Sequence, residues 1–211
     1  MVLKDNWKIG LKNAALVTID LQRAFLQTGA PVECAKARDF VPKVNELTRI
    51  CREVGIPVIH VYHSHRADLS DIGLLQEIRP RTESEFETLE GTKGTEFYKD
   101  LDVKKGDYVV KKIRYSAFIS GSSSLERLLR GLGRDSLIIC GVVTDVCVAT
   151  TIVDAMMLDF RVFLVGDLTT TLSEERQKVA LEVLDRHFAK IMTFEEVYAE
   201  LKQLAAEPKS D

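Results

Sequence analysis

Short apolar runs alternate along the chain with longer stretches in which apolar residues recur every three or four positions. The runs predict strands buried on both faces, and the spaced pattern predicts amphipathic helices. The predicted strands are Ala14–Ile19, Pro57–Tyr62, Tyr108–Lys111, Leu137–Cys140, Arg161–Val165 and Lys190–Met192. The predicted helices are Val41–Val54, Leu125–Leu132, Asp145–Leu158, Ser173–Phe188 and a last one that follows a capping box of Thr193 and Glu196.

The alternation of strands and helices favours an α/β fold. It predicts three layers, α/β/α, around a six-stranded, mainly parallel sheet of the Rossmann-like type. A single domain is expected over residues 1–211, with its core at about 11–201. The segment from His63 to Lys105 carries no long helical pattern, and uncovered segments of this length are usually lids or binding loops.

Composition and charge exclude several classes of protein. Hydrophobic residues make up 45% of the 211 residues, charged residues 29%, and the net charge is −3 without a basic block. Nucleic acid and anionic membranes are therefore not expected as partners. The chain has neither an apolar run long enough for a transmembrane helix nor an apolar leader in its first residues. Its four cysteines then indicate reduced thiols and a cytoplasmic location.

Three reactive residues fall just after predicted strands. Asp20 follows the first strand, Lys112 follows the third, and Cys147 stands near the start of the helix after the fourth. Ligands of parallel sheets bind at the carboxyl ends of the strands, so all three belong to one edge. Taken singly, they are typical of a turn aspartate, a solvated lysine and a buried core cysteine. Together they fit an activated nucleophile, because a carboxylate accepts a thiol proton and an ammonium group stabilises thiolate.

Cys147 has the most informative surroundings. The segment Cys140–Cys147 reads as a strand end, a turn and a helix start. We expect the positive end of the helix dipole to lower the pKa of this thiol, and the free N–H groups of the first turn to hold an oxyanion. No histidine stands near Cys147, which disfavours a papain-like pair. The chain also lacks a Cys-x-x-Cys motif, which disfavours a redox protein.

Three segments resemble the signatures of the isochorismatase-like cysteine hydrolases: Val17–Gln22, Lys112–Phe118 and Cys140–Val148. That family includes nicotinamidases, N-carbamoylsarcosine amidohydrolases and ureidoacrylate or biuret hydrolases. The resemblance implies a catalytic triad of Asp20, Lys112 and Cys147. It also implies a cis peptide between Val142 and Val143, and an oxyanion hole made by the N–H groups of Val143 and Cys147. The implied reaction cleaves the C–N bond of a small carboxamide or N-carbamoyl compound through a thioester and releases ammonia.

The same resemblance suggests contacts to the substrate and bears on metal binding. The expected substrate-binding residues are Gln22, Phe25, His65, Arg114, Tyr115 and Phe118, with Arg114 a candidate to meet a carboxylate. His63, His65 and Asp71 are candidate ligands for Zn²⁺ or Fe²⁺. The stretch departs from the pattern of metal-dependent nicotinamidases, because His63 replaces an aspartate and Asp71 replaces a histidine. No cofactor is therefore expected.

Two other functions stay open at this point. One is a metal-assisted nicotinamidase, and the other is a non-catalytic member of the family that binds a ligand. Cys147 argues against hydrolysis of the isochorismate vinyl ether, because members with that activity usually lack this cysteine. The resemblance also implies a homo-oligomer, either a dimer or a tetramer, with a small-molecule amide as substrate.

Overall fold

The six predicted strands form one parallel sheet in the order β3-β2-β1-β4-β5-β6. We describe residues 3–206 of the chain from a computed structural model. The predicted domain limits of 1–211 include residues 1–2 and 207–211, which lie outside the described residues. The strands are β1 (Ala14–Ile19), β2 (Val58–His63), β3 (Tyr108–Lys112), β4 (Ser136–Val142), β5 (Arg161–Thr170) and β6 (Lys190–Met192).

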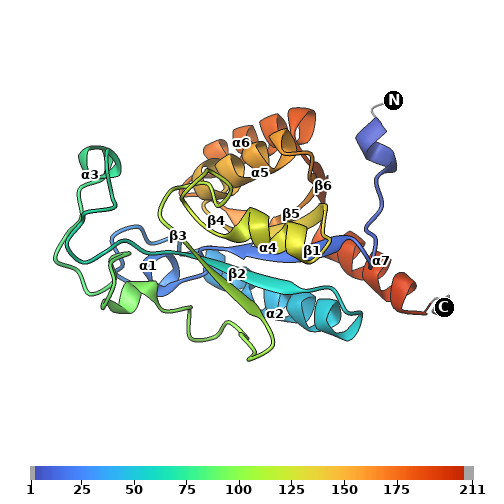
Figure 1. Cartoon of the computed structure of the whole chain (residues 1–211), viewed down its shortest axis with the longest axis horizontal. Helices are drawn as coiled ribbons and strands as arrows, with labels where there is room; N and C mark the ends of the chain where they lie inside the picture. Colours follow the sequence, from blue (N-terminus) through green and yellow to red (C-terminus); the bar gives the residue numbers. More distant parts are fainter. Residues whose placement is uncertain (1–2, 207–211) are drawn as a thin grey trace.

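Helices cover both faces of the sheet, as the sequence predicted (Figure 1). One face packs against α2 (Ala37–Glu53) and α7 (Phe194–Ala206). The other packs against α4 (Leu125–Gly131), α5 (Ala149–Met157) and α6 (Glu174–His187). Short helical turns complete the chain: η1 (Leu3–Asn6), α1 (Arg23–Leu26), α3 (Leu75–Ile78), η2 (Lys93–Thr95) and η3 (Thr144–Val148). The three-layer α/β/α fold is therefore confirmed.

The central strand shows why the apolar runs predicted buried strands. Leu16 of β1 packs with α2 and α7, whereas Val17 and Ile19 pack with α4 and α5. Successive side chains of a strand point to opposite faces, so a strand covered on both sides is apolar throughout. All six residues of β1 are buried accordingly.

The last helix begins as predicted, whereas β5 and the helix that follows β4 differ from prediction. The capping box is present, since Thr193 N–H donates to Glu196 and Glu196 N–H donates to the Thr193 hydroxyl. Strand β5 continues through Gly166 to Thr170, beyond its predicted end at Val165. The helix predicted at Asp145–Leu158 is divided into η3, a turn of π-helix, and α5.

A glycine allows the two central strands to come together beside the reactive residues. A Cβ atom on Gly141 would lie 2.1 Å from the carbonyl oxygen of Ile19, and Gly141 has a φ of +124°. Only glycine tolerates both the contact and this backbone conformation. Asp20 directly follows Ile19 and has a φ of 54°, so it lies next to this close contact between β1 and β4. The Val142–Val143 peptide that follows is cis, as expected.

The connection between β2 and β3 is the longest in the chain and contains only α3 and η2. Helix α3 lies at the far end of the molecule from α7, away from the sheet (Figure 1). The base of the connection is tied to β3, because Ser64 N–H donates to the Lys112 carbonyl. It is also held to a later part of the same connection, because His65 N–H donates to the Thr88 carbonyl and Glu90 N–H donates to the His65 carbonyl. We refer to residues 64–107 as the lid segment.

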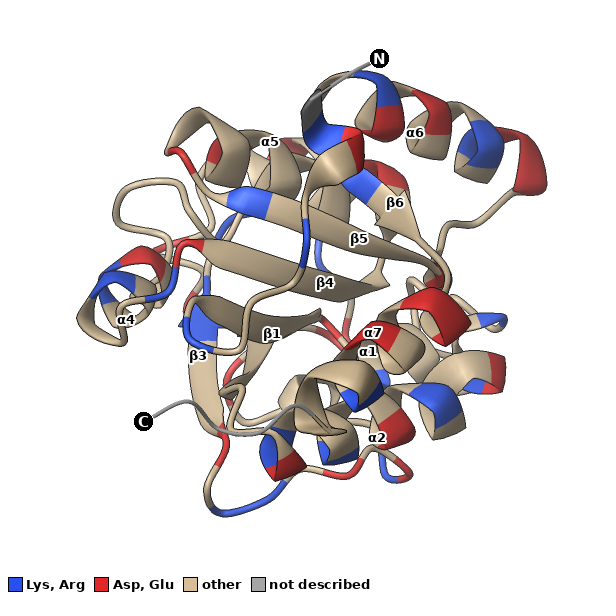
Figure 2. Cartoon of the chain, turned by 90° about the vertical axis from the view of Figure 1, so that its right-hand side faces the viewer, with Lys and Arg blue, Asp and Glu red and all other residues tan. Residues whose placement is uncertain are grey.

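Charged residues of both signs are mixed on the helices (Figure 2). This distribution agrees with the absence of a basic block in the sequence. Within residues 3–206, no helix combines the length and the apolar character needed to cross a membrane.

Candidate active site

Asp20, Lys112 and Cys147 meet at the carboxyl ends of the strands. Lys112 Nζ lies 2.8 Å from Asp20 Oδ2 and 3.4 Å from Cys147 Sγ. It also donates to the carbonyl of Arg114 at 3.1 Å. Asp20 and Lys112 are completely buried, and Cys147 is 3% exposed. The predicted trio is thus a buried ion pair in contact with a thiol.

Burial sets the charge state of this cluster. It raises the pKa of the Cys147 thiol to about 12, and Lys112 offsets only part of that rise. The expected lowering of this pKa is therefore wrong, because removal from water outweighs the nearby positive charge of Lys112. Burial also raises the pKa of Asp20 against the opposing effect of Lys112. Burial by itself lowers the pKa of Lys112, but Asp20 and Cys147 raise it above its ordinary value.

Cys147 opens into a cavity of about 150 Å³. Its wall includes five residues that the sequence predicted for the site, namely Phe25, His63, Tyr115, Val143 and Cys147. It also includes seven others: Val32, Arg79, Arg81, Thr88, Val146, Leu172 and Arg176. Because Val143 and Cys147 share this wall, the two predicted oxyanion donors come from one surface of the cavity.

Four of the predicted substrate-binding residues lie outside this lining. Gln22 is buried, accepts from His63 N–H at 2.7 Å and donates to the carbonyls of His63 and Gly94. Its amide therefore joins β2 to the lid segment. Phe118 packs on Phe160, with ring centroids 5.2 Å apart.

The remaining two, Arg114 and His65, hold the lid segment. The Arg114 guanidinium donates to the carbonyl of Asp71 at 2.8 Å. His65 lies completely buried between His63 and Asp71.

These histidines form a hydrogen-bonded chain with Asp71. His63 Nε2 and His65 Nε2 are 2.9 Å apart, and His65 Nδ1 is 3.2 Å from Asp71 Oδ1. Burial lowers the pKa of His65 to about 4 and that of His63 well below its ordinary value, so both rings are neutral near pH 7. A carboxylate only accepts, so His65 donates through Nδ1, and its Nε2 accepts from His63. These hydrogen bonds therefore fix the tautomer of His63, which lines the cavity.

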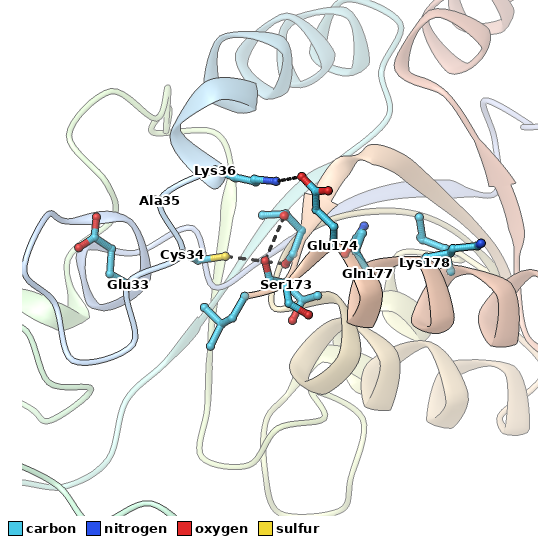
Figure 3. A pocket seen from close by; sticks show the side chains of 12 residues that line it. Glu33, Cys34, Ala35, Lys36, Ser173, Glu174, Gln177 and Lys178 are labelled. Carbon is cyan, nitrogen blue, oxygen red and sulfur yellow. Dashed lines mark hydrogen bonds and ion pairs between the residues drawn. The ribbon is translucent and has the colours of Figure 1, made fainter.

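Figure 3 shows a larger cavity of about 520 Å³. Leu172 is the one residue that lines both this cavity and the first. Residues 33–36 and the start of α6 line it, and Lys36 pairs with Glu174 across it. Its one thiol, Cys34, has a pKa raised to about 11 by burial. No member of the trio lines this cavity, whereas Cys147 lines the smaller one. The smaller cavity is therefore the candidate active site.

The family of the chain follows from comparison with known proteins. A sequence model described as the Isochorismatase domain matches residues 14–196. The chain therefore belongs to the isochorismatase family of hydrolases, and the predicted resemblance is confirmed.

The relatives within this family carry different names. A probable inactive nicotinamidase of Arabidopsis thaliana is 32% identical over 175 residues, which cover 82% of this chain and 86% of the relative. A ureidoacrylate amidohydrolase of Azorhizobium caulinodans is 26% identical over 223 residues, which cover 96% of this chain and 96% of the relative.

Two solved structures show the same fold. A cysteine hydrolase of Pseudomonas syringae pv. phaseolicola has a TM-score of 0.87 at 24% identity, covering 94% of this chain and 96% of that one. A pyrazinamidase of Pyrococcus horikoshii in complex with zinc has a TM-score of 0.75 at 28% identity, covering 86% and 99%.

The zinc in that pyrazinamidase raises the question of a metal here. Within residues 3–206, the only three candidate ligands whose atoms lie within 4.8 Å of one another are Asp20, His63 and Cys147. Lys112 Nζ contacts two of these groups and would repel a cation. The candidate set of His63, His65 and Asp71 does not converge, because these side chains are bonded in a row. The residues present therefore do not fit a three-ligand metal centre.

Sequence reasoning missed the polar residues that the lid segment brings to the cavity. Arg79, Arg81 and Thr88 line it, although they stand far from the three motifs in sequence. The one signal was the pair of arginines flanking Pro80 in the segment predicted to be a lid or binding loop.

Proposed function

We propose that this chain is a cysteine hydrolase that cleaves the C–N bond of a small carboxamide or N-carbamoyl compound and releases ammonia. One observation carries the proposal: Lys112 Nζ contacts both the Asp20 carboxylate and the Cys147 thiol beside a small cavity. A buried carboxylate that can act as base and a cation that can stabilise thiolate are two groups that activate a cysteine nucleophile.

In the first step Asp20 takes the proton of Cys147, and Lys112 stabilises the thiolate. A base is needed because the pKa of the buried thiol is raised to about 12. The thiolate then bonds to the amide carbon while the carbonyl π electrons move to oxygen. The resulting oxyanion accepts hydrogen bonds from the N–H groups of Val143 and Cys147. Loss of one such donor typically slows a reaction by about 10²–10³-fold.

In the second step the oxyanion collapses and the C–N bond breaks. Asp20 returns its proton to the leaving nitrogen, and ammonia departs from a thioester on Cys147. An N-carbamoyl substrate gives the corresponding thiocarbamate. Water then loses a proton to Asp20 and attacks the same carbon. The acid is released, and the proton on Asp20 returns to the Cys147 sulfur, which restores the starting state.

The relatives support this reaction class, because they include a ureidoacrylate amidohydrolase. A metal-assisted nicotinamidase is the second candidate from the sequence. The bonds between His63, His65 and Asp71 argue against it, since they occupy the side chains that a metal would need.

The test is ammonia release from a panel that contains nicotinamide, simple carboxamides, N-carbamoylsarcosine, ureidoacrylate and biuret. Wild type, Cys147→Ala and Cys34→Ala are compared, because Cys34 is a second buried thiol outside the catalytic cavity. We expect release from one class of compound, lost in Cys147→Ala and kept in Cys34→Ala. Release that persists in Cys147→Ala would refute the nucleophile, and dependence on added metal would favour the nicotinamidase.

A further inference from the structure

The charges on the wall of the catalytic cavity do not cancel. Three arginines line it, and Lys112 lies behind Cys147. Lys112 is neutralised by Asp20, with 2.8 Å between the charged atoms. Arg176 is neutralised by Asp145, which accepts from its Nε at 2.6 Å. The net charge of the wall therefore depends on whether Arg79 and Arg81 are neutralised.

A single carboxylate serves both of these arginines. Arg79 Nη2 donates to Glu87 Oε2 at 3.0 Å, while Glu87 Oε1 accepts from the N–H and the hydroxyl of Thr82. Burial tends to raise the pKa of Glu87, but Arg79 and Thr82 together lower it below its ordinary value. Glu87 is thus ionised and fully bonded, and its charge compensates Arg79. One positive charge, that of Arg81, is left over.

Arg81 is buried with most of its donors unused. Its side chain is 5% exposed, and its Nε lies 3.8 Å from Glu87 Oε2, which is too far for a hydrogen bond. Within residues 3–206 its one side-chain hydrogen bond runs from Nη1 to the carbonyl of Arg79, and buried Nε has no partner. A guanidinium group has five N–H donors and cannot lose its charge. Burial of such a group with only a share in one carboxylate as counter-charge is costly.

Thr88 adds a second unsatisfied group to the same cavity. Thr88 is 2% exposed, and its hydroxyl has no hydrogen-bond partner within the described residues. Buried polar side chains are nearly always bonded, so an unbonded hydroxyl and a largely unbonded guanidinium group on the wall of one cavity indicate a site for a polar ligand.

We propose that Arg81 and Thr88 bind a carboxylate of the substrate, so that the amide attacked by Cys147 belongs to a small acid. This inference rests on the proposed function and names its substrate class. A carboxylate is planar and accepts two parallel N–H bonds from a guanidinium fork. One such group neutralises the one uncompensated charge of the wall.

The volume of the cavity limits the size of that acid. About 150 Å³ is the volume of an engineered protein cavity that holds one benzene molecule. The substrate therefore consists of a terminal amide or ureido group, a spacer of one or two atoms and the carboxylate. A neutral aromatic amide fits the volume but leaves Arg81 uncompensated, and sites built around a polar partner reject ligands that lack it.

The experiment compares acids with neutral molecules of the same shape. Succinamate is paired with 4-methylpentanamide, and N-carbamoylglycine is paired with isobutylurea, so each carboxylate is replaced by an isopropyl group. We expect the acids to be hydrolysed with a kcat/KM at least about 10²-fold higher. Arg81→Met should abolish this preference, Arg81→Lys should restore part of it, and Thr88→Val should reduce it about tenfold. Arg66→Met, which removes an exposed arginine of the same lid segment, should leave it unchanged.

Binding gives a readout that does not depend on turnover. Calorimetry of Cys147→Ala with succinamate should detect binding that is lost in the double variant with Arg81→Met, whereas 4-methylpentanamide should not bind. Circular dichroism establishes that each variant is folded. If the acid binds through Arg81 but wild type releases no ammonia, the carboxylate site stands and the proposed hydrolysis fails. If neutral amides are hydrolysed or bound as well as the acids, or no acid binds, the carboxylate site is refuted.

Discussion

Lys112 Nζ at the end of β3 lies 2.8 Å from the Asp20 carboxylate at the end of β1, although β2 separates these strands in the sheet. The lysine side chain crosses the position of His63, its register partner on β2, to reach the aspartate. The same ammonium group lies 3.4 Å from Cys147 Sγ. It therefore joins three segments of the chain into one site.

Loss of this ammonium group should affect stability as well as activity. Lys112→Met leaves Asp20 completely buried without a counter-charge, which is expected to cost about 3–5 kcal/mol of unfolding free energy. Ammonia release should fall by at least about 10²-fold. Urea unfolding and a steady-state assay measure the two effects.

Lys111→Met is the matched control for this substitution. Lys111 is the preceding residue and forms a surface ion pair with Glu90, so its loss should change stability by less than about 1 kcal/mol. Equal effects of the two substitutions would contradict the assignment of Lys112.

The resting thiol of Cys147 should be protonated at neutral pH. Burial raises its pKa to about 12, and burial also raises the pKa of Cys34 to about 11 and that of Cys140 to about 12. Ultraviolet difference spectra of wild type against Cys147→Ala should show no thiolate band near neutral pH. A thiolate band assigned to Cys147 under those conditions would mean that the nucleophile is preformed, without the need for Asp20 as base.

Acid should destabilise the fold through the buried histidines. Burial lowers the pKa of His65 from 6.5 to about 4, so between these values the unfolded chain binds a proton that the folded chain does not. Stability is therefore lost as the pH falls through this window, by on the order of 2–3 kcal/mol. Urea midpoints measured across the window provide the test. His65→Gln should flatten the slope and His187→Gln should not, whereas equal slopes in all three proteins would argue against a neutral His65.

The approach of β4 to β1 depends on Gly141. A Cβ atom there would lie 2.1 Å from the Ile19 carbonyl oxygen, so Gly141→Ala must displace one of the central strands. We expect a loss of more than about 3 kcal/mol and no activity. Gly131→Ala, where nothing lies within 4 Å of the added carbon, should stabilise helix α4 slightly instead. Thermal melts compare the two, and a tolerated Gly141→Ala would contradict the packing described here.

The strands and the trio could be predicted because their signals are local. An apolar run predicts a buried strand, and parallel strands bring their carboxyl ends to one edge, so Asp20, Lys112 and Cys147 had to approach one another. The pKa of Cys147 could not be predicted in the same way. Its direction depends on how completely the lid segment and the sheet exclude water, which no spacing along the chain reveals.

The lid segment also limited the prediction of substrate contacts. Arg79, Arg81 and Thr88 line the cavity because of the local conformation of the lid segment, in which Glu87 accepts a hydrogen bond from Arg79. No pattern in the sequence distinguishes Glu87. Gln22 and Arg114 looked available for substrate, yet their donors bind backbone carbonyls. The homo-oligomer stays a prediction.

Mass spectrometry of wild type, quenched during turnover of the best acid in the matched pairs, tests directly whether Cys147 is the nucleophile. An acyl adduct, equal to the substrate minus ammonia, should appear on the peptide that carries Cys147 and not on those that carry the other cysteines. The adduct should be missing in Cys147→Ala, which should also release no ammonia. Continued ammonia release by Cys147→Ala, or turnover with an adduct elsewhere, would contradict the claim that Cys147 is the nucleophile.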